Sequence, residues 1–143
     1  MADTVVADTV AAWLRQSAHD LGHAGAAMAA GTHDWACLAA VHAAEKAIKA
    51  VLLAHGGRVL GSQNLLMLLE RIRNETGAAV DDTLADDART LMQALAVLAG
   101  QCTYSGIAPY ELTTRAQADG ALSAARRLHA HFAALTAAPT AEA

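Results

Sequence analysis

Apolar residues recur every three or four positions through most of the chain, the spacing that gathers side chains on one face of an α-helix. The pattern predicts five helices, at about residues 8–30, 34–55, 62–76, 81–100 and 114–136. The segment between the last two helices is predicted to be an irregular connector that carries Tyr104 and Tyr110.

Residues at three of the predicted boundaries have strong capping tendencies. Gly56-Gly57 indicates the end of the second helix, because glycine readily adopts the left-handed conformation found there. Ser62 is the expected N-cap of the third helix. Thr114-x-x-Gln117 is a capping-box pattern at the start of the last helix.

The composition strengthens the helical interpretation. The 143 residues are rich in Ala and Leu, with two Pro and one Phe, so strong helix formers dominate. We expect an all-α protein, an up-and-down bundle of four to five helices that forms one domain over residues 1–143. Its core is expected at about 8–136, with a disordered tail at 137–143. Because alanines bury little area, a partner subunit would add useful burial.

The charge is negative overall but unevenly distributed. A net charge of −4 argues against a general nucleic-acid coating protein, which would be strongly basic. Between residues 46 and 73 the cations are Lys46, Lys49, Arg58, Arg71 and Arg73, against Glu70 alone. This zone is consistent with an anionic ligand and also with an ordinary solvated helix surface.

Cysteine usage and the absence of targeting signals point to the cytoplasm. Cys37 and Cys102 form no Cys-x-x-Cys motif, so reduced thiols are expected. The first ten residues contain no basic region followed by an apolar run, so no signal peptide is visible. The longest uncharged stretch, residues 90–110, contains several polar side chains and is not expected to span a membrane.

A carboxylate interrupts the apolar face of the second predicted helix. At 100° per residue Leu38, Val41, Ile48 and Leu52 share a face. Glu45 lies between Val41 and Ile48, near the middle of this face. Burying an unpaired carboxylate costs on the order of several kcal/mol. Glu45 therefore needs a cationic or hydrogen-bonding partner, or its face opens onto a groove.

Two interpretations of the residues around Glu45 stay open. Lys49 follows Glu45 by four positions, which is the favourable order for an ordinary intrahelical ion pair. Alternatively, His42 and Lys46 join this pair in a polar cluster at a subunit interface or groove that binds a ligand. Tyr104 is a further candidate ligand residue, because its ring can stack on a base, although such tyrosines also cap the ends of bundles.

Other motifs indicate neither a metal site nor a cofactor. His19 and His23 lie four apart on the first predicted helix, but two imidazoles supply too few ligands for structural zinc. The chain contains no Glu-x-x-His pair of the di-metal bundles. Nucleophile elbows, phosphate loops and dinucleotide fingerprints are also missing from it.

The chain resembles the HEPN family, small helical bundles named for higher eukaryotes and prokaryotes nucleotide-binding. The most specific part is Ala43-Ala44-Glu45-Lys46-Ala47-Ile48-Lys49, which is similar to the family's small-small-Glu-Lys-Ala-aliphatic-Lys run. Asn64-Leu65-x-x-Leu68-Leu69 is similar to the opening of the family's third helix, with Gln63 where a histidine is common. The resemblance covers about residues 13–132.

The resemblance implies a cytoplasmic prokaryotic protein that forms a dimer. It would bind a nucleotide or nucleic acid, or would be the partner of a small nucleotidyltransferase. In this interpretation Lys46 and Lys49 suit phosphate, Glu45 orients them, and His42 lines or braces the dimer groove.

The family's ribonuclease members carry Arg followed, after four to six residues, by His. Arg126 and His131 satisfy this spacing but lie about 140° apart around a helix. Arg127 also replaces the usual polar residue after the arginine. We therefore favour a non-catalytic protein. Two alternatives are a ribonuclease toxin of a toxin–antitoxin pair that uses Arg126 and His131, and an interaction module without a ligand.

Overall fold

The structure is a bundle of helices. The computed structural model describes residues 2–58 and 64–137, with their side chains except those at 2, 3 and 100–105. The helices in this part of the chain are α1 (Ala2–Ala30), α2 (His33–Ala54), α3 (Leu65–Thr76), α4 (Asp82–Ser105), α5 (Pro109–Leu112) and α6 (Arg115–Thr136). No strand occurs among the described residues, and the all-α prediction is confirmed.

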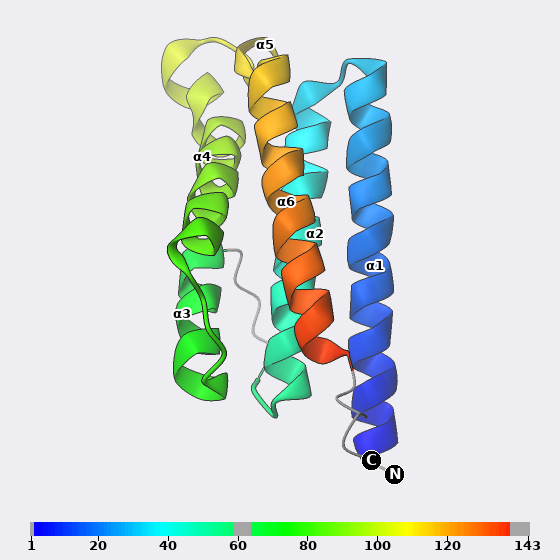
Figure 1. The fold of residues 1–143 in the computed structure, drawn as a ribbon. Helices are drawn as coiled ribbons and strands as arrows, with labels where there is room; N and C mark the ends of the chain where they lie inside the picture. Colours follow the sequence, from blue (N-terminus) through cyan, green and yellow to red (C-terminus); the bar gives the residue numbers. More distant parts are fainter. Residues whose placement is uncertain (1, 59–63, 138–143) are drawn as a thin grey trace.

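The long helices run up and down along a common direction (Figure 1). Helix α2 is at the centre of the arrangement, because it packs against α1, α3, α4, α5 and α6. Figure 1 shows α1 on one side of α2 and α6, and α3 with α4 on the other side. This arrangement leaves one face of α2 available to carry a functional site.

Side-chain size differs across the core. Alanines dominate the contact of α1 with α2 and α6, where Ala24, Ala36, Ala40, Ala43 and Ala121 have no solvent exposure. Towards α3 and α4 the fully buried side chains are larger: Ile48, Leu52, Leu65, Ile72, Leu91, Leu128 and Phe132. Small residues allow close approach of α1 and α2, whereas the larger ones supply most of the buried apolar area.

Local capping interactions fix several helix ends. The Thr114 hydroxyl accepts a hydrogen bond from the Gln117 backbone N–H (3.1 Å), and the Gln117 amide oxygen accepts one from the Thr114 N–H (2.9 Å). The capping box predicted there is confirmed. At the start of α4 the Asp81 carboxylate accepts a hydrogen bond from the Leu84 N–H (3.0 Å).

Three predicted boundaries were wrong. Helix α1 begins six residues earlier than expected, at Ala2 rather than 8. The N-cap of α3 is Asn64, which accepts a hydrogen bond from the Met67 N–H, and the predicted cap Ser62 lies outside the described residues. Helix α4 continues through Gly100 to Ser105, because an interior glycine costs a helix only about 1 kcal/mol. Its C-cap is Gly106, whose φ of 74° is in the left-handed region.

The predicted irregular connector is also mostly helical. Its first part belongs to α4, and Pro109 opens the short α5, a position where its missing N–H loses no helical hydrogen bond. The tail expected from 137 onward lies outside the described residues after Ala137, which caps α6.

Candidate functional site

The outer residues of α2 form one stripe along the helix. They recur every three or four positions and are named here the α2 stripe: Trp35, Leu38, His42, Glu45, Lys46, Lys49 and Leu53. Trp35 is exposed, Lys49 is buried and the others are half-buried. All four α2 residues that the sequence singled out therefore lie together on this stripe. Val41, Ile48 and Leu52 are fully buried beside the stripe, whereas Leu38, predicted to share their face, is only half-buried. Glu45 is therefore at the boundary of the core rather than in the middle of the apolar face, and this part of the prediction was wrong.

Glu45 and Lys49 form an intrahelical ion pair. The Lys49 Nζ lies 2.6 Å from the Glu45 Oε2, and the side chains of Lys49 and Glu45 are only 6% and 12% exposed. A pair this well shielded interacts more strongly than a surface pair, and each partner makes burial of the other tolerable. Its negative and positive charges cancel locally.

Lys46 pairs with a different helix. Its ammonium group donates a hydrogen bond to Asp20 of α1, whose other carboxylate oxygen accepts one from the Gln16 amide at 2.9 Å. A recess of about 180 Å³ beside this pair is lined by Ala12, Trp13, Gln16 and Lys46. Sequence reasoning missed Trp13, Gln16 and Asp20, because they reach Lys46 only through the packing of α1 on α2.

His42 lies on the stripe one helical turn before Lys46 and is half-buried. Within the described part of the chain its ring makes no hydrogen bond. Tyr104 belongs to α4, but its side chain lies outside the described residues. The ligand roles assigned to these residues stay predictions.

The basic zone between residues 46 and 73 is largely neutralised. Besides the two lysines, Arg71 pairs with Glu75 at 2.8 Å and Arg73 with Glu70 at 3.1 Å. The Glu75 hydrogen bond raises the pKa of Arg71 and lowers that of Glu75. These helical pairs match the solvated-surface interpretation of the zone better than an anion site.

A buried polar junction joins α1, α2 and α6. The Ser17 hydroxyl, which has no solvent exposure, donates a hydrogen bond to the Ala43 carbonyl at 2.7 Å. Its oxygen also lies 2.8 Å from His129 Nδ1. Since the hydroxyl has one proton, we infer that His129 Nδ1 carries the hydrogen and donates it to Ser17. Burial lowers the pKa of His129, because desolvation disfavours the imidazolium.

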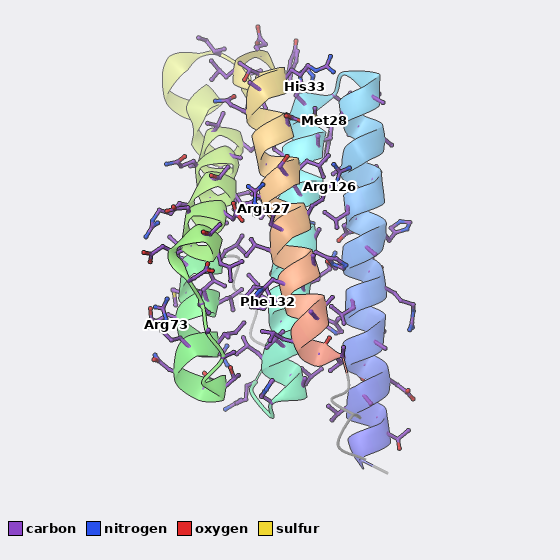
Figure 2. All side chains as sticks on the ribbon, in the orientation of Figure 1. Met28, His33, Arg73, Arg126, Arg127 and Phe132 are labelled. Atoms are coloured by element: carbon purple, nitrogen blue, oxygen red, sulfur yellow. The ribbon has the colours of Figure 1, made fainter. Side chains whose placement is uncertain are left out.

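Arg126 and His131 have different environments. The Arg126 guanidinium lies beside Gly25 of α1, with one nitrogen 3.8 Å from the position that a Cβ on this glycine would occupy. Figure 2 shows Arg126 on the side of α6 that faces α1, and Arg127 on the side towards α4. His131 Nε2 is buried with no hydrogen-bond partner in the described part of the chain, and its ring meets Phe132 edge-on.

Arg127 has a structural partner instead. Its guanidinium donates two hydrogen bonds to Asp87 of α4, at 2.9 and 2.7 Å, and this carboxylate raises the pKa of Arg127. The bidentate contact joins α4 to α6 and is not available to a ligand.

A pocket lies where α2 begins. It has a volume of about 390 Å³ and lies between the start of α2, the second half of α4, and α5. Trp35 and Tyr110 on its rim are 58% and 67% exposed, and Leu38, Leu95 and Leu98 supply apolar surface. The Asp34 carboxylate also lines this pocket, and it has no hydrogen-bond or ion-pair partner among the described residues.

A larger groove of about 610 Å³ lies between the first half of α1 and the final turns of α2 and α6. Its walls include Val6, Val10, Leu14 and Leu53, and no charged side chain of the described residues lines it. It offers apolar surface but no group that would orient a ligand.

The described residues include no cluster of three or more His, Cys, Asp or Glu side chains arranged to hold a metal ion. None of the helices in this part of the chain is both long and apolar enough to cross a bilayer.

The fold and these surfaces define a small helical bundle whose polar groups are mostly paired internally. The sequence model of the HEPN domain matches residues 10–133, and the chain belongs to this family. A search of curated proteins gives no match.

Solved structures of similar fold cover nearly the whole chain. TT1696 from Thermus thermophilus has a TM-score of 0.78 and 29% identity, covering 87% of this chain and 95% of its own. ST0689, an archaeal HEPN homologue, has a TM-score of 0.72 and 24% identity over 89% and 97% of the two chains. An HEPN domain protein (tm0613) from Thermotoga maritima gives 0.66 and 24% over 86% and 95%.

Proposed function

We propose that this HEPN protein is a non-catalytic binding module that acts through the α2 stripe. The first occupant of the stripe is a second copy of the chain, which gives a homodimer. A small nucleotidyltransferase, implied by the family resemblance, is the further protein partner. We place the module in the cytoplasm.

The observation that carries this proposal is the pairing of both stripe lysines. Lys49 is paired with Glu45, and Lys46 is paired with Asp20. A phosphate site needs cations whose charge is not already compensated. A protein interface instead favours charges that stay paired when water is removed, because an unpaired buried charge is costly. The stripe meets the second requirement.

The shape of the stripe also suits a protein partner. Helix α2 has 22 residues and is therefore about 33 Å long. Trp35, Leu38 and Leu53 add apolar surface at its two ends, and His42 supplies a half-buried polar group near the middle. Aromatic anchors with a neutral polar centre are typical of binding interfaces.

Mass measurement with a matched pair of variants tests the dimer. Wild-type protein at about 100 μM is expected to have twice the 14.7 kDa mass of one chain in sedimentation velocity. His42→Glu adds an uncompensated charge to the stripe and should give a monomer. His23→Glu places the same charge on the exposed surface of α1 and should leave the dimer intact. A monomeric wild type, or a dimeric His42→Glu variant, contradicts the proposal.

A nucleotide is the second candidate ligand, and the recess beside Trp13 favours it. The Trp13 indole ring there can stack on a base. A phosphate would have to displace Asp20 from the Lys46 ammonium group, which also lines the recess. Titration with ATP and with a short RNA tests this candidate. If it is correct, Lys46→Ala weakens binding about tenfold, while Arg89→Ala on the exposed surface of α4 does not. Equal affinity in Lys46→Ala, Lys49→Ala and wild type removes the ligand role of both lysines.

The non-catalytic part of the proposal is supported by the separate environments of Arg126 and His131. The imidazole Nε2 is shielded from water, so it is poorly placed to exchange protons with a substrate. Purified protein is expected to leave RNA intact. Cleavage that is lost in His131→Ala would establish the ribonuclease alternative.

A further inference from the structure

The pocket at the start of α2 has an unusual combination of groups. Two exposed aromatic side chains, Trp35 and Tyr110, flank an apolar surface into which a single carboxylate, Asp34, is set. A contiguous exposed apolar surface with a polar group at its edge is typical of an interaction site, whereas single exposed apolar residues are common. The local fold brings these groups together. Asp34 and Trp35 are in the first turn of α2, Tyr110 is the second residue of α5, and α2 packs against α5.

The electrostatics of this pocket favour a cation. Asp34 has no partner among the described residues, and the pocket lining that they form includes no Lys, Arg or His. The negative charge of Asp34 also acts on Cys37. Burial raises the pKa of this thiol to about 11, and the carboxylate adds to the effect. An anionic ligand would be repelled, whereas the faces of Trp and Tyr rings attract cations.

We propose that this pocket, formed by Asp34, Trp35 and Tyr110, receives the guanidinium group of an arginine presented by a protein partner. The inference rests on the proposed function only in that the arginine belongs to a bound protein. It names a chemical feature of that partner. It also gives the start of the α2 stripe, whose Trp35 and Leu38 line the pocket, a role separate from that of the centre of the stripe.

Arginine fits the pocket better than other cations do. Its planar guanidinium can stack on an aromatic ring and donate two parallel hydrogen bonds to one carboxylate, which a lysine ammonium cannot do. Its three methylenes can lie on Leu38, Leu95 and Leu98, which form the apolar part of the lining. The volume of about 390 Å³ is within the range of small-ligand sites, so a long side chain can be accommodated.

Titration with small amides tests the chemistry directly on the full chain. The probes are N-acetyl-arginine amide, N-acetyl-lysine amide, and N-acetyl-citrulline amide, a neutral isostere of the arginine probe. The readout is the Trp35 indole N–H resonance, observed in a Trp13→Phe variant so that one indole signal is followed. The arginine probe should shift this resonance with millimolar affinity, and the lysine and citrulline probes should bind at least about fivefold more weakly.

Variants then locate the site. Asp34→Asn and Tyr110→Ala should each weaken binding of the arginine probe about fivefold or more. Asp8→Asn, which removes the same charge from the exposed surface of α1, should leave the affinity unchanged. Since Asp34 has no partner among the described residues and Tyr110 is exposed, both variants are expected to fold, and circular dichroism verifies this.

The outcomes separate this inference from the dimer proposal. Equal binding of the arginine and citrulline probes, equal binding of the lysine probe, or an unchanged affinity in Asp34→Asn overturns the guanidinium site. Arginine binding to a wild type that sediments as a monomer supports the site and contradicts the homodimer. A wild type that sediments as a dimer and whose Trp35 signal does not respond to arginine supports the homodimer and contradicts the guanidinium site.

Discussion

Charged side chains at the centre of α2 are paired with one another or with α1, whereas the carboxylate at its start is not paired among the described residues. At the centre, Glu45 is paired with Lys49, and Lys46 is paired with Asp20. At the start, one turn of helix presents Asp34 with no partner among the described residues, next to two exposed aromatic rings. The same helix therefore has a polar region whose charges are paired by side chains and a first turn whose carboxylate makes no side-chain ion pair among the described residues.

This difference shows that the position of a charged residue on a helix does not define its role. A compensated pair can be covered by another protein at little electrostatic cost, whereas a lone carboxylate beside aromatic faces gains by acquiring a cation. Three predictions test the two regions separately, beginning with the largest expected effect.

Removing one partner of the shielded pair should have the largest effect on stability. Glu45→Ala leaves Lys49, whose side chain is 6% exposed, without its counterion, and is expected to lower the free energy of unfolding by about 3 kcal/mol. Asp20→Ala removes the partner of the more exposed Lys46 and should cost about 1 kcal/mol. Urea unfolding of the two variants measures both values.

A double variant is the control for this explanation. Glu45→Met with Lys49→Met removes both charges and fills similar space, so it should recover most of the stability lost in Glu45→Ala. Equal losses in Glu45→Ala and Asp20→Ala would mean that shielding does not distinguish the two pairs.

The Ser17 junction beside the centre of α2 predicts a pH dependence. Because burial lowers the pKa of His129 below its ordinary value of 6.5, the unfolded chain binds the proton more readily than the folded protein does. The stability that this group contributes is thus present above about pH 6.5 and is lost as the pH falls through the folded pKa. Urea unfolding between about pH 7.5 and 5 should show a smaller loss for His129→Gln than for wild type.

The matched control for this pH effect is His23→Gln on the exposed surface of α1. It should retain the wild-type pH dependence. A His129→Gln variant with the wild-type slope would show that another group dominates the pH dependence of stability in this range.

The smallest predicted effect concerns the start of α2. Burial is the main reason that the pKa of Cys37 is about 11, and Asp34 adds to it. Asp34→Asn should therefore lower the pKa of this thiol slightly and raise its alkylation rate at about pH 9. Iodoacetamide labelling in a Cys102→Ser background measures the rate. Asp8→Asn should not change it, and an unchanged rate in Asp34→Asn would mean that the carboxylate does not reach the thiol.

Much of the fold could be predicted from sequence because helices depend on nearby residues. The apolar period indicated the five long helices, and the Thr114–Gln117 box marks a helix start that the structure retains. The end of α4 was predicted wrongly at Gly100, because a single glycine stops a helix only where the chain must turn. The Glu45–Lys49 contact was foreseeable for the same local reason.

The sequence by itself therefore determined the five long helices, the family and the proximity of Glu45, Lys46 and Lys49 on α2. Only the tertiary structure decided that Lys46 meets Asp20, that Ser17 joins His129, and that Trp35 and Tyr110 flank one pocket. A helix fixes neighbours three or four residues away through its own hydrogen bonds. Contacts between residues from different helices depend on how the whole core packs, and no short stretch of sequence specifies that.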